Sequence, residues 1–269
     1  MSSWKPLAGR VTFLSAFNML TSAPSSLDVF QSLWKTTPDN FRKSANPLLP
    51  SVAQGKNGEI QINCSIAAGR ADINFSPVIP SMDQDAAPTL RFIESPDQLH
   101  VCFEDVIEGV KSGALHLNAG RVAIEVHFVC LENDIPSANQ SLVQTIPRPY
   151  QLNLSDEEDV IFQVNRFFVT KNGNRLNAVC NWSLVRFQLL NFSIAATLGQ
   201  PVDVPSSVFQ TDVSLLGASL KLEVNNAILQ SSPVLERADQ AVILSEGLAK
   251  ITTTQQEYGL NVSGFQHVE

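Results

Sequence analysis

The stretch that decides the fold covers residues 59–76 and reads EIQINCSIAAGRADINFS. In each half of it, apolar residues occupy every second position, and acids, amides, arginine and serine occupy most of the positions between them. This alternation is the period of a half-buried β-strand. Asn57-Gly58 precedes the first half and suits a tight hairpin turn, and Ala67-Ala68-Gly69 separates the two halves. The stretch therefore predicts two adjacent strands that share one apolar and one polar face.

The clearest helix signal lies further along, at Ser95-Pro96-Asp97-Gln98. It combines an N-cap serine, a proline at the first helical position and a glutamine that closes a capping box, and Gly113 is a natural stop. Apolar residues at helical spacing predict the remaining helices, and alternation of apolar and polar residues predicts the remaining strands. Helices are expected after Ser25 or Ser26, over 137–145, and from Ser232-Pro233 to about residue 255 with Leu235, Ala238 and Val242 inward; strands are expected over 11–17, 51–54, 121–128, 160–170, 175–190 and 211–225.

Written in order, residues 9–113 give β-α-β-β-β-α, and residues 120–255 give the same pattern. The sequence thus predicts an α+β protein whose two halves form antiparallel sheets, with helices packed on one face and a pseudo-two-fold relation between the halves. We place these halves at residues 1–115 and 116–269 and expect them to pack intimately.

Composition limits the classes of function. The chain has 269 residues, 44% of them hydrophobic, a formal charge of −8 and a pI near 5.0. Such a chain is long enough to bury a core, and it lacks the concentrated basic surface that binding to nucleic acid requires. No apolar run approaches the roughly 20 residues of a membrane helix. We expect a soluble cytoplasmic protein.

Secretion is the alternative to a cytoplasmic location. Lys5 and Arg10 precede an apolar run over 11–20 that ends in Thr21-Ser22-Ala23, which outlines a signal peptide over residues 1–23. A secreted eukaryotic protein with Asn-x-Ser triplets would carry glycans. Seven such triplets occur, at Asn63, Asn74, Asn139, Asn153, Asn181, Asn191 and Asn261.

The cysteines and histidines do not form a metal motif. Cys64, Cys102, Cys130 and Cys180 lie far apart at mostly apolar positions, so buried free thiols are expected, with zinc ligation or two disulfides as the alternatives. The histidines, at 100, 116, 127 and 267, are dispersed. Neither a G-x-S-x-G elbow, a P-loop nor a G-x-G-x-x-G occurs. We expect neither a metal nor a cofactor.

Three segments resemble a group of sequences. Gly9-Arg-Val-Thr-Phe, Gly69-Arg-Ala-Asp-Ile-Asn-Phe and Leu176-Asn-Ala-Val-Cys-Asn-Trp, with the order of elements, resemble sporadically distributed, uncharacterised bacterial proteins of about 260 residues. The resemblance implies a bacterial origin and carries no functional residue to this chain.

The candidate site lies on the polar faces of the predicted strands. It comprises Glu59, Gln61, Asn63, Arg70, Asp72 and Asn74 across the hairpin, with Glu125 and His127 on a later strand. These donors and acceptors suit a recognition surface, and the first hypothesis is a non-catalytic protein-interaction subunit of a bacterial multi-protein system. Its partner would be another protein, for instance one encoded in the same operon. The alternative is a hydrolase-type enzyme that uses the carboxylates of Glu59 and Asp72 with His127.

Overall fold

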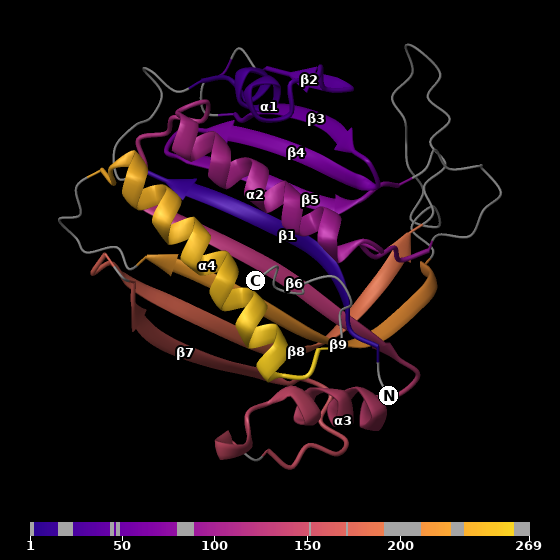
Figure 1. The fold of residues 1–269 in the computed structure, drawn as a ribbon. Coiled ribbons are helices and arrows are strands. Elements are labelled where there is room, and N and C mark those ends of the chain that lie inside the picture. Colours follow the sequence, from indigo (N-terminus) through magenta and orange to yellow (C-terminus); the bar gives the residue numbers. More distant parts are fainter. Residues whose placement is uncertain are drawn as a thin grey trace, which may run out of the picture.

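The computed structural model describes residues 3–15, 24–43, 46, 49–79, 89–150, 152–170, 172–190, 211–226 and 234–260. In these residues the chain forms one antiparallel sheet of nine strands in the order β2-β3-β4-β5-β1-β6-β9-β8-β7, and four α-helices (Figure 1). The architecture is therefore α+β, as predicted. Since β1 pairs with β6, the strands of both halves belong to one continuous sheet.

The elements have the following bounds. The strands are β1 (Lys5–Leu14), β2 (Asn40–Arg42), β3 (Ser51–Asn57), β4 (Ile60–Ala67), β5 (Arg70–Pro77), β6 (Arg121–Glu132), β7 (Ile161–Val169), β8 (Arg175–Leu190) and β9 (Thr211–Asn226). The helices are α1 (Ser26–Trp34), α2 (Pro96–Ser112), α3 (Ile135–Thr145) and α4 (Arg237–Glu257), with a 3-10 turn, η2 (Arg148–Tyr150).

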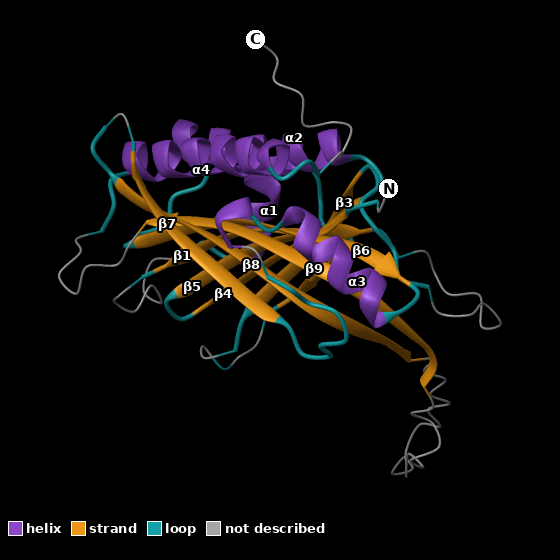
Figure 2. Ribbon diagram, turned by 90° about the horizontal axis from the view of Figure 1, so that it is seen from below, coloured by secondary structure: helices purple, strands orange, loops and turns teal. Residues whose placement is uncertain are grey.

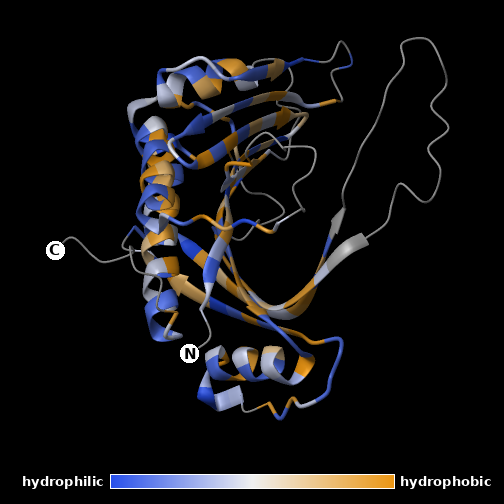
Figure 3. Cartoon of the chain, turned by 90° about the vertical axis from the view of Figure 1, so that its right-hand side faces the viewer, coloured by the Kyte–Doolittle hydropathy of each residue, from blue (hydrophilic) through white to orange (hydrophobic). Residues whose placement is uncertain are grey.

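The described helices cover one face of the sheet, and α2 and α4 lie side by side along it (Figure 2). Close packing fixes this layer: a Cβ on Gly9 of β1 would lie 2.7 Å from the Phe103 ring of α2. A Cβ on Gly55 of β3 would likewise lie 2.4 Å from the Phe30 ring of α1. Hydrophobic and hydrophilic residues alternate along the strands (Figure 3). The alternation buries one face of each central strand and leaves a second face that no described helix covers.

Local signals fix the helix ends. The Ser95 hydroxyl accepts a hydrogen bond from the Gln98 N–H at 3.3 Å, and α2 stops at Gly113, whose φ is 82°. Ser25 caps α1 in a capping box with Asp28, and the two hydrogen bonds from Ser25 lower the pKa of the Asp28 carboxyl. The predicted starts of both helices are confirmed. The capping box expected at α2 is not formed, because the Gln98 side chain donates to the Asn57 carbonyl and accepts from the Glu59 N–H.

Four local expectations need correction. Strand β1 begins at Lys5 rather than at residue 11, because it continues past a register shift between Pro6 and Ala8. The linker after α1 contains β2, which was not predicted. Helix α4 begins at Arg237, and Ala238 is exposed rather than inward. Strand β3 continues to Asn57.

Parts of two predicted elements, Phe17 in the first strand and Ser232-Pro233 in the last helix, lie outside the described residues. In the described part of the chain, no helix is both long enough and apolar enough to cross a membrane.

Candidate functional site

The sheet face opposite the helices, here called the uncovered face, carries the outward side chains of all nine strands. At its centre, β1 lies between β5 and β6, and β9 follows β6. Polar side chains from these four strands gather there in a central charged cluster. Its members are Arg10, Thr12, Arg70, Asp72, Arg121, Glu125, Glu223 and Asn225.

Ion pairs neutralise the central charged cluster from within. Arg10 donates from Nη2 to Glu125 Oε2 at 2.9 Å, a pair that joins β1 to β6. Arg121 lies 3.4 Å from Glu223 Oε1, a pair that joins β6 to β9. The third pair, Arg70 with Asp72, lies along β5. The three arginines therefore face three carboxylates, and the cluster has no net charge.

Hydrogen bonds hold the Asp72 carboxylate from two sides. The buried Thr12 hydroxyl donates to Oδ1 at 2.7 Å, and Arg70 Nη2 donates to the same oxygen at 3.0 Å. The bond to Asp72 also raises the pKa of the Arg70 guanidinium. A pocket of about 190 Å³ opens beside Thr12, Arg70 and Arg121. Asp72 thus serves as an acceptor in a fixed network.

His127 lies apart from this network on β6. Its Nε2 is 2.8 Å from the Ser219 hydroxyl of β9. Burial lowers the pKa of His127 to about 4, and the positive charge of Lys221 acts in the same direction. The imidazole is therefore neutral near pH 7. Glu125, two residues earlier, pairs with Arg10, so its carboxylate is directed to the guanidinium.

The structure brings some of the predicted site residues together. Asn63 and Asn74 are direct cross-strand partners on β4 and β5, and Arg70 contacts Asp72. Gln61, on the same face, donates from its side-chain amide to the Gly55 carbonyl at 2.9 Å. These residues form a continuous polar surface across β4 and β5.

Other predicted residues are far from one another. Asp72 lies opposite Thr12 of β1 and His127 lies opposite Ala8, so the spacing of residues and strands separates them by roughly 16 Å. Glu59 precedes β4, and its carbonyl accepts from the Val78 N–H at 3.0 Å, roughly 20 Å along β5 from Asp72. The carboxylates of Glu59 and Asp72 and the imidazole of His127 do not converge on one pocket.

The sequence did not point to five members of the central charged cluster. These are Arg10, Thr12, Arg121, Glu223 and Asn225. All five occupy the polar positions of strands in which polar and apolar residues alternate, and this alternation is visible in the sequence. Which strands are neighbours is a long-range property, and the pairing of β1 with β6 could not be read from the local pattern.

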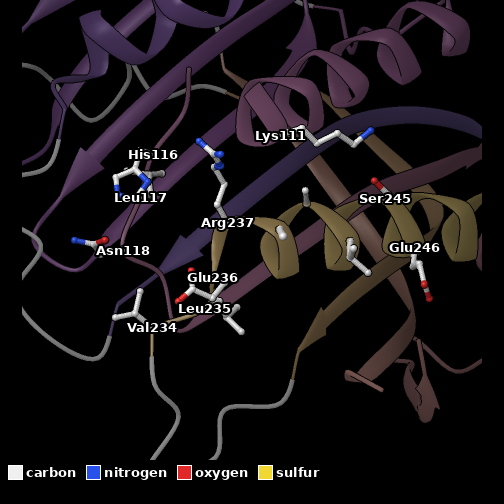
Figure 4. Close-up of a pocket in the computed structure, with 13 residues that line it drawn as sticks. Lys111, His116, Leu117, Asn118, Val234, Leu235, Glu236, Arg237, Ser245 and Glu246 are labelled. Atoms are coloured by element: carbon white, nitrogen blue, oxygen red, sulfur yellow. The ribbon is translucent and has the colours of Figure 1, made fainter. Parts of the chain in front are cut away.

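A groove of about 900 Å³ lies between the end of α2 and the start of α4 (Figure 4). Lys111, His116 and Arg237 bring basic groups to it, and Glu236 and Glu246 bring acidic ones. Arg237 packs against Gly113, where a Cβ would lie 2.3 Å from its Nη1. Lys111 pairs with Glu108 at 3.1 Å. The groove between these two helix ends is thus lined by both basic and acidic side chains.

The cysteines and the glycosylation triplets also have defined places. All four cysteines are buried and free, as predicted. Asn139 is fully buried in α3 and donates to the carbonyls of Ser155 and Glu157, so it cannot carry a glycan in this fold. Asn153 is exposed, and Asn191 and Asn261 lie outside the described residues. In the described ranges, no three His, Cys, Asp or Glu side chains form a metal-binding group.

Comparison with known proteins gives no relative. No family model matches the chain, and neither the curated proteins nor the solved structures searched contain a match.

Proposed function

We propose that this protein is a non-catalytic interaction subunit that docks a partner protein on its uncovered face. One observation carries the proposal: the described helices all lie over the other face, and the uncovered face presents a polar surface whose central charges are already paired. A rigid surface of this kind loses little conformational entropy when a partner binds. Its charges are also held in place before the partner arrives.

The pairing weighs against the hydrolase alternative. A general base must have a free carboxylate or imidazole within reach of a substrate proton. Here Asp72 accepts from Thr12 and Arg70, Glu125 is held by Arg10, and His127 contacts Ser219. Each of these candidate groups has a structural partner, which supports a binding role.

The chemistry of the face favours a polar protein surface as its ligand. The central charged cluster is neutral overall, so it offers no single-sign field that would attract a polyanion. Amides flank it on both sides: Asn63 and Asn74 on β4 and β5, and Asn181 and Gln163 on β8 and β7. Amides both donate and accept hydrogen bonds, which matches the mixed groups of a protein surface.

The proposal includes an internal repeat. Outward from the central pair β1 and β6, the strands read β5-β4-β3-β2 on one side and β9-β8-β7 on the other, and the long helices α2 and α4 close the two halves. Among the described strands, the short β2 has no counterpart on the second side, and the others correspond one to one. This order supports a pseudo-two-fold axis between β1 and β6. The Arg10–Glu125 pair would then lie at the junction of the two repeats.

The proposal also covers the organism, the assembly and the compartment in which the protein acts. We place the protein in a bacterial multi-protein system, with a partner encoded in the same operon and a cytoplasmic location. The resemblance of the segments beginning at Gly9, Gly69 and Leu176 supports the bacterial origin alone.

Site-specific photo-crosslinking tests the docking face. A photoreactive amino acid at Asn74, on the uncovered face, should capture a partner protein in the native host, while the same amino acid at exposed Gln31 of α1 should not. Asn74→Arg should abolish stoichiometric co-purification of that partner, and the matched change Gln31→Arg should leave it intact. Capture at Gln31 in place of Asn74, or a bait that retains no protein, would contradict the proposal.

A further inference from the structure

The two edges of the sheet differ in length and in chemistry. Strand β2 closes one edge with three residues, whereas β7 closes the other with nine, IFQVNRFFV. Its outward side chains include Ile161, Phe167 and Val169, which are 80%, 56% and 66% exposed. Soluble proteins usually shorten, charge or cover such an edge, because a long apolar edge strand recruits another strand. Strand β7 has one charged residue, Arg166, and neither proline nor glycine.

Hydrogen bonding shows which backbone groups of β7 are available at the open edge. The Leu184 N–H donates to the Val160 carbonyl at 3.1 Å, and the Thr170 N–H donates to the Asn174 carbonyl at 2.8 Å. Both bonds follow the register of β7 with β8, in which bonded and non-bonded pairs alternate. Even-numbered residues therefore bond to β8. The N–H and C=O groups of residues 161, 163, 165, 167 and 169 point away from it.

The sequence of β7 is self-complementary about Asn165. In an antiparallel pair centred on this residue, each odd-numbered residue meets another odd-numbered one, as the available backbone groups require. Ile161 then lies opposite Val169 of a second copy. On the helix-covered side, Phe162 lies opposite Phe168. Such aromatic and β-branched cross-strand pairs stabilise sheets.

We propose that a second copy of this chain pairs with β7 through β7 itself, in an antiparallel register centred on Asn165. The two sheets become one continuous sheet about a two-fold axis perpendicular to it, so that both uncovered faces lie on the same side. Arg166 lies opposite Val164 of the other copy, and the two guanidinium groups do not face each other directly. The inference does not depend on the proposed docking of a partner protein.

Sedimentation equilibrium of the full chain tests the dimer. The wild type should be a dimer in the micromolar range. Asn165→Pro should be a monomer, because proline removes an N–H that points to the open edge and leaves the ladder to β8 intact. Phe167→Lys should also be a monomer, while Phe41→Lys, an exposed phenylalanine on the opposite edge, should remain a dimer. A monomeric wild type, or a dimer that persists in folded Asn165→Pro, would overturn the proposal.

Cysteine crosslinking tests the register even if these variants fold poorly. In a β7 pair centred on residue 165, the Cα atoms of the two copies of that residue lie about 5.5 Å apart, which a disulfide can span. Asn165→Cys should form a covalent dimer under mild oxidation. Gln163→Cys should not, because the two copies of residue 163 would lie roughly 14 Å apart. Equal crosslinking of both variants, or crosslinking of Gln163→Cys alone, would disprove this register.

Discussion

His127 Nε2 lies 2.8 Å from the Ser219 hydroxyl, a contact that joins β6 to β9 across the uncovered face. The imidazole is largely buried beside Lys221, and its pKa is lowered to about 4. In the unfolded chain the pKa returns to about 6.5. His127 is therefore a group that folding keeps neutral.

This shift predicts a loss of stability in mild acid. As the pH falls from about 6.5 to about 4, the unfolded state takes up a proton at His127 that the folded state does not. The free energy of unfolding then decreases by up to roughly 1.4 kcal/mol per pH unit in this window. The free energy of unfolding, measured by urea denaturation at several pH values in this window, should fall less steeply with decreasing pH in His127→Gln than in the wild type. His116→Gln, at an exposed position, should keep the wild-type dependence on pH. The same pH dependence of the free energy of unfolding in the wild type and in His127→Gln would contradict this prediction.

The Arg10–Glu125 pair should contribute measurably to stability. Its side chains are 35% and 19% exposed, while those of the Lys5–Glu94 pair are 43% and 64% exposed. A double-mutant cycle of Arg10→Met and Glu125→Gln should give a coupling energy of about 1 kcal/mol, since screening by water is weaker there. The cycle of Lys5→Met and Glu94→Gln should give a few tenths at most. Reversal of this order, measured by urea denaturation, would argue against a structural role for the central charged cluster.

The local elements were predictable where the pattern was regular. The hairpin over residues 59–76 and the capped start of α2 agree with the structure because alternation and capping are properties of neighbouring residues. Prediction failed where the pattern was irregular or very short. The register shift near Pro6 hid the first part of β1, and β2 has only three residues.

The candidate site was predicted in part for a similar reason. The polar positions Asp72 and Glu125 were identified, but their partners Thr12 and Arg10 come from a strand whose place in the sheet depends on distant contacts. Ser219 lies 92 positions from His127. A local pattern identifies a polar face, and the order of the strands decides which groups meet on it.

The cysteines should be inert in the folded protein. Burial raises the pKa of Cys64 and Cys180, and burial, together with the nearby Asp105 charge, raises that of Cys102 to about 12. The reactive thiolate is therefore scarce near neutral pH. A thiol-reactive dye should label the native protein slowly and should titrate four thiols in urea without reductant. Rapid labelling of the native protein, or fewer than four thiols in urea, would show that the cysteines are exposed or bonded.

Gly247 gives a prediction in which two effects oppose each other. In the middle of a helix, glycine is about 1 kcal/mol less favourable than alanine, so Gly247→Ala should stabilise α4 if propensity alone decided. An added Cβ, however, would lie 2.7 Å from Ile124 Cγ2 and 3.4 Å from Val224 Cβ. Both contacts belong to β-branched side chains, which have little rotameric freedom to move away. Overpacking of this kind costs about 1–3 kcal/mol.

We therefore expect Gly247→Ala to lower the free energy of unfolding by about 1 kcal/mol, because the clash exceeds the gain in propensity. The background Ile124→Ala, itself destabilised by about 2–5 kcal/mol, removes the clashing methyl group. In that background the added methyl group fills part of the cavity, so Gly247→Ala should become neutral or stabilising. Urea denaturation of the four proteins gives the sign of the coupling. Stabilisation by Gly247→Ala in the wild type would mean that α4 lies further from β6 than the structure shows.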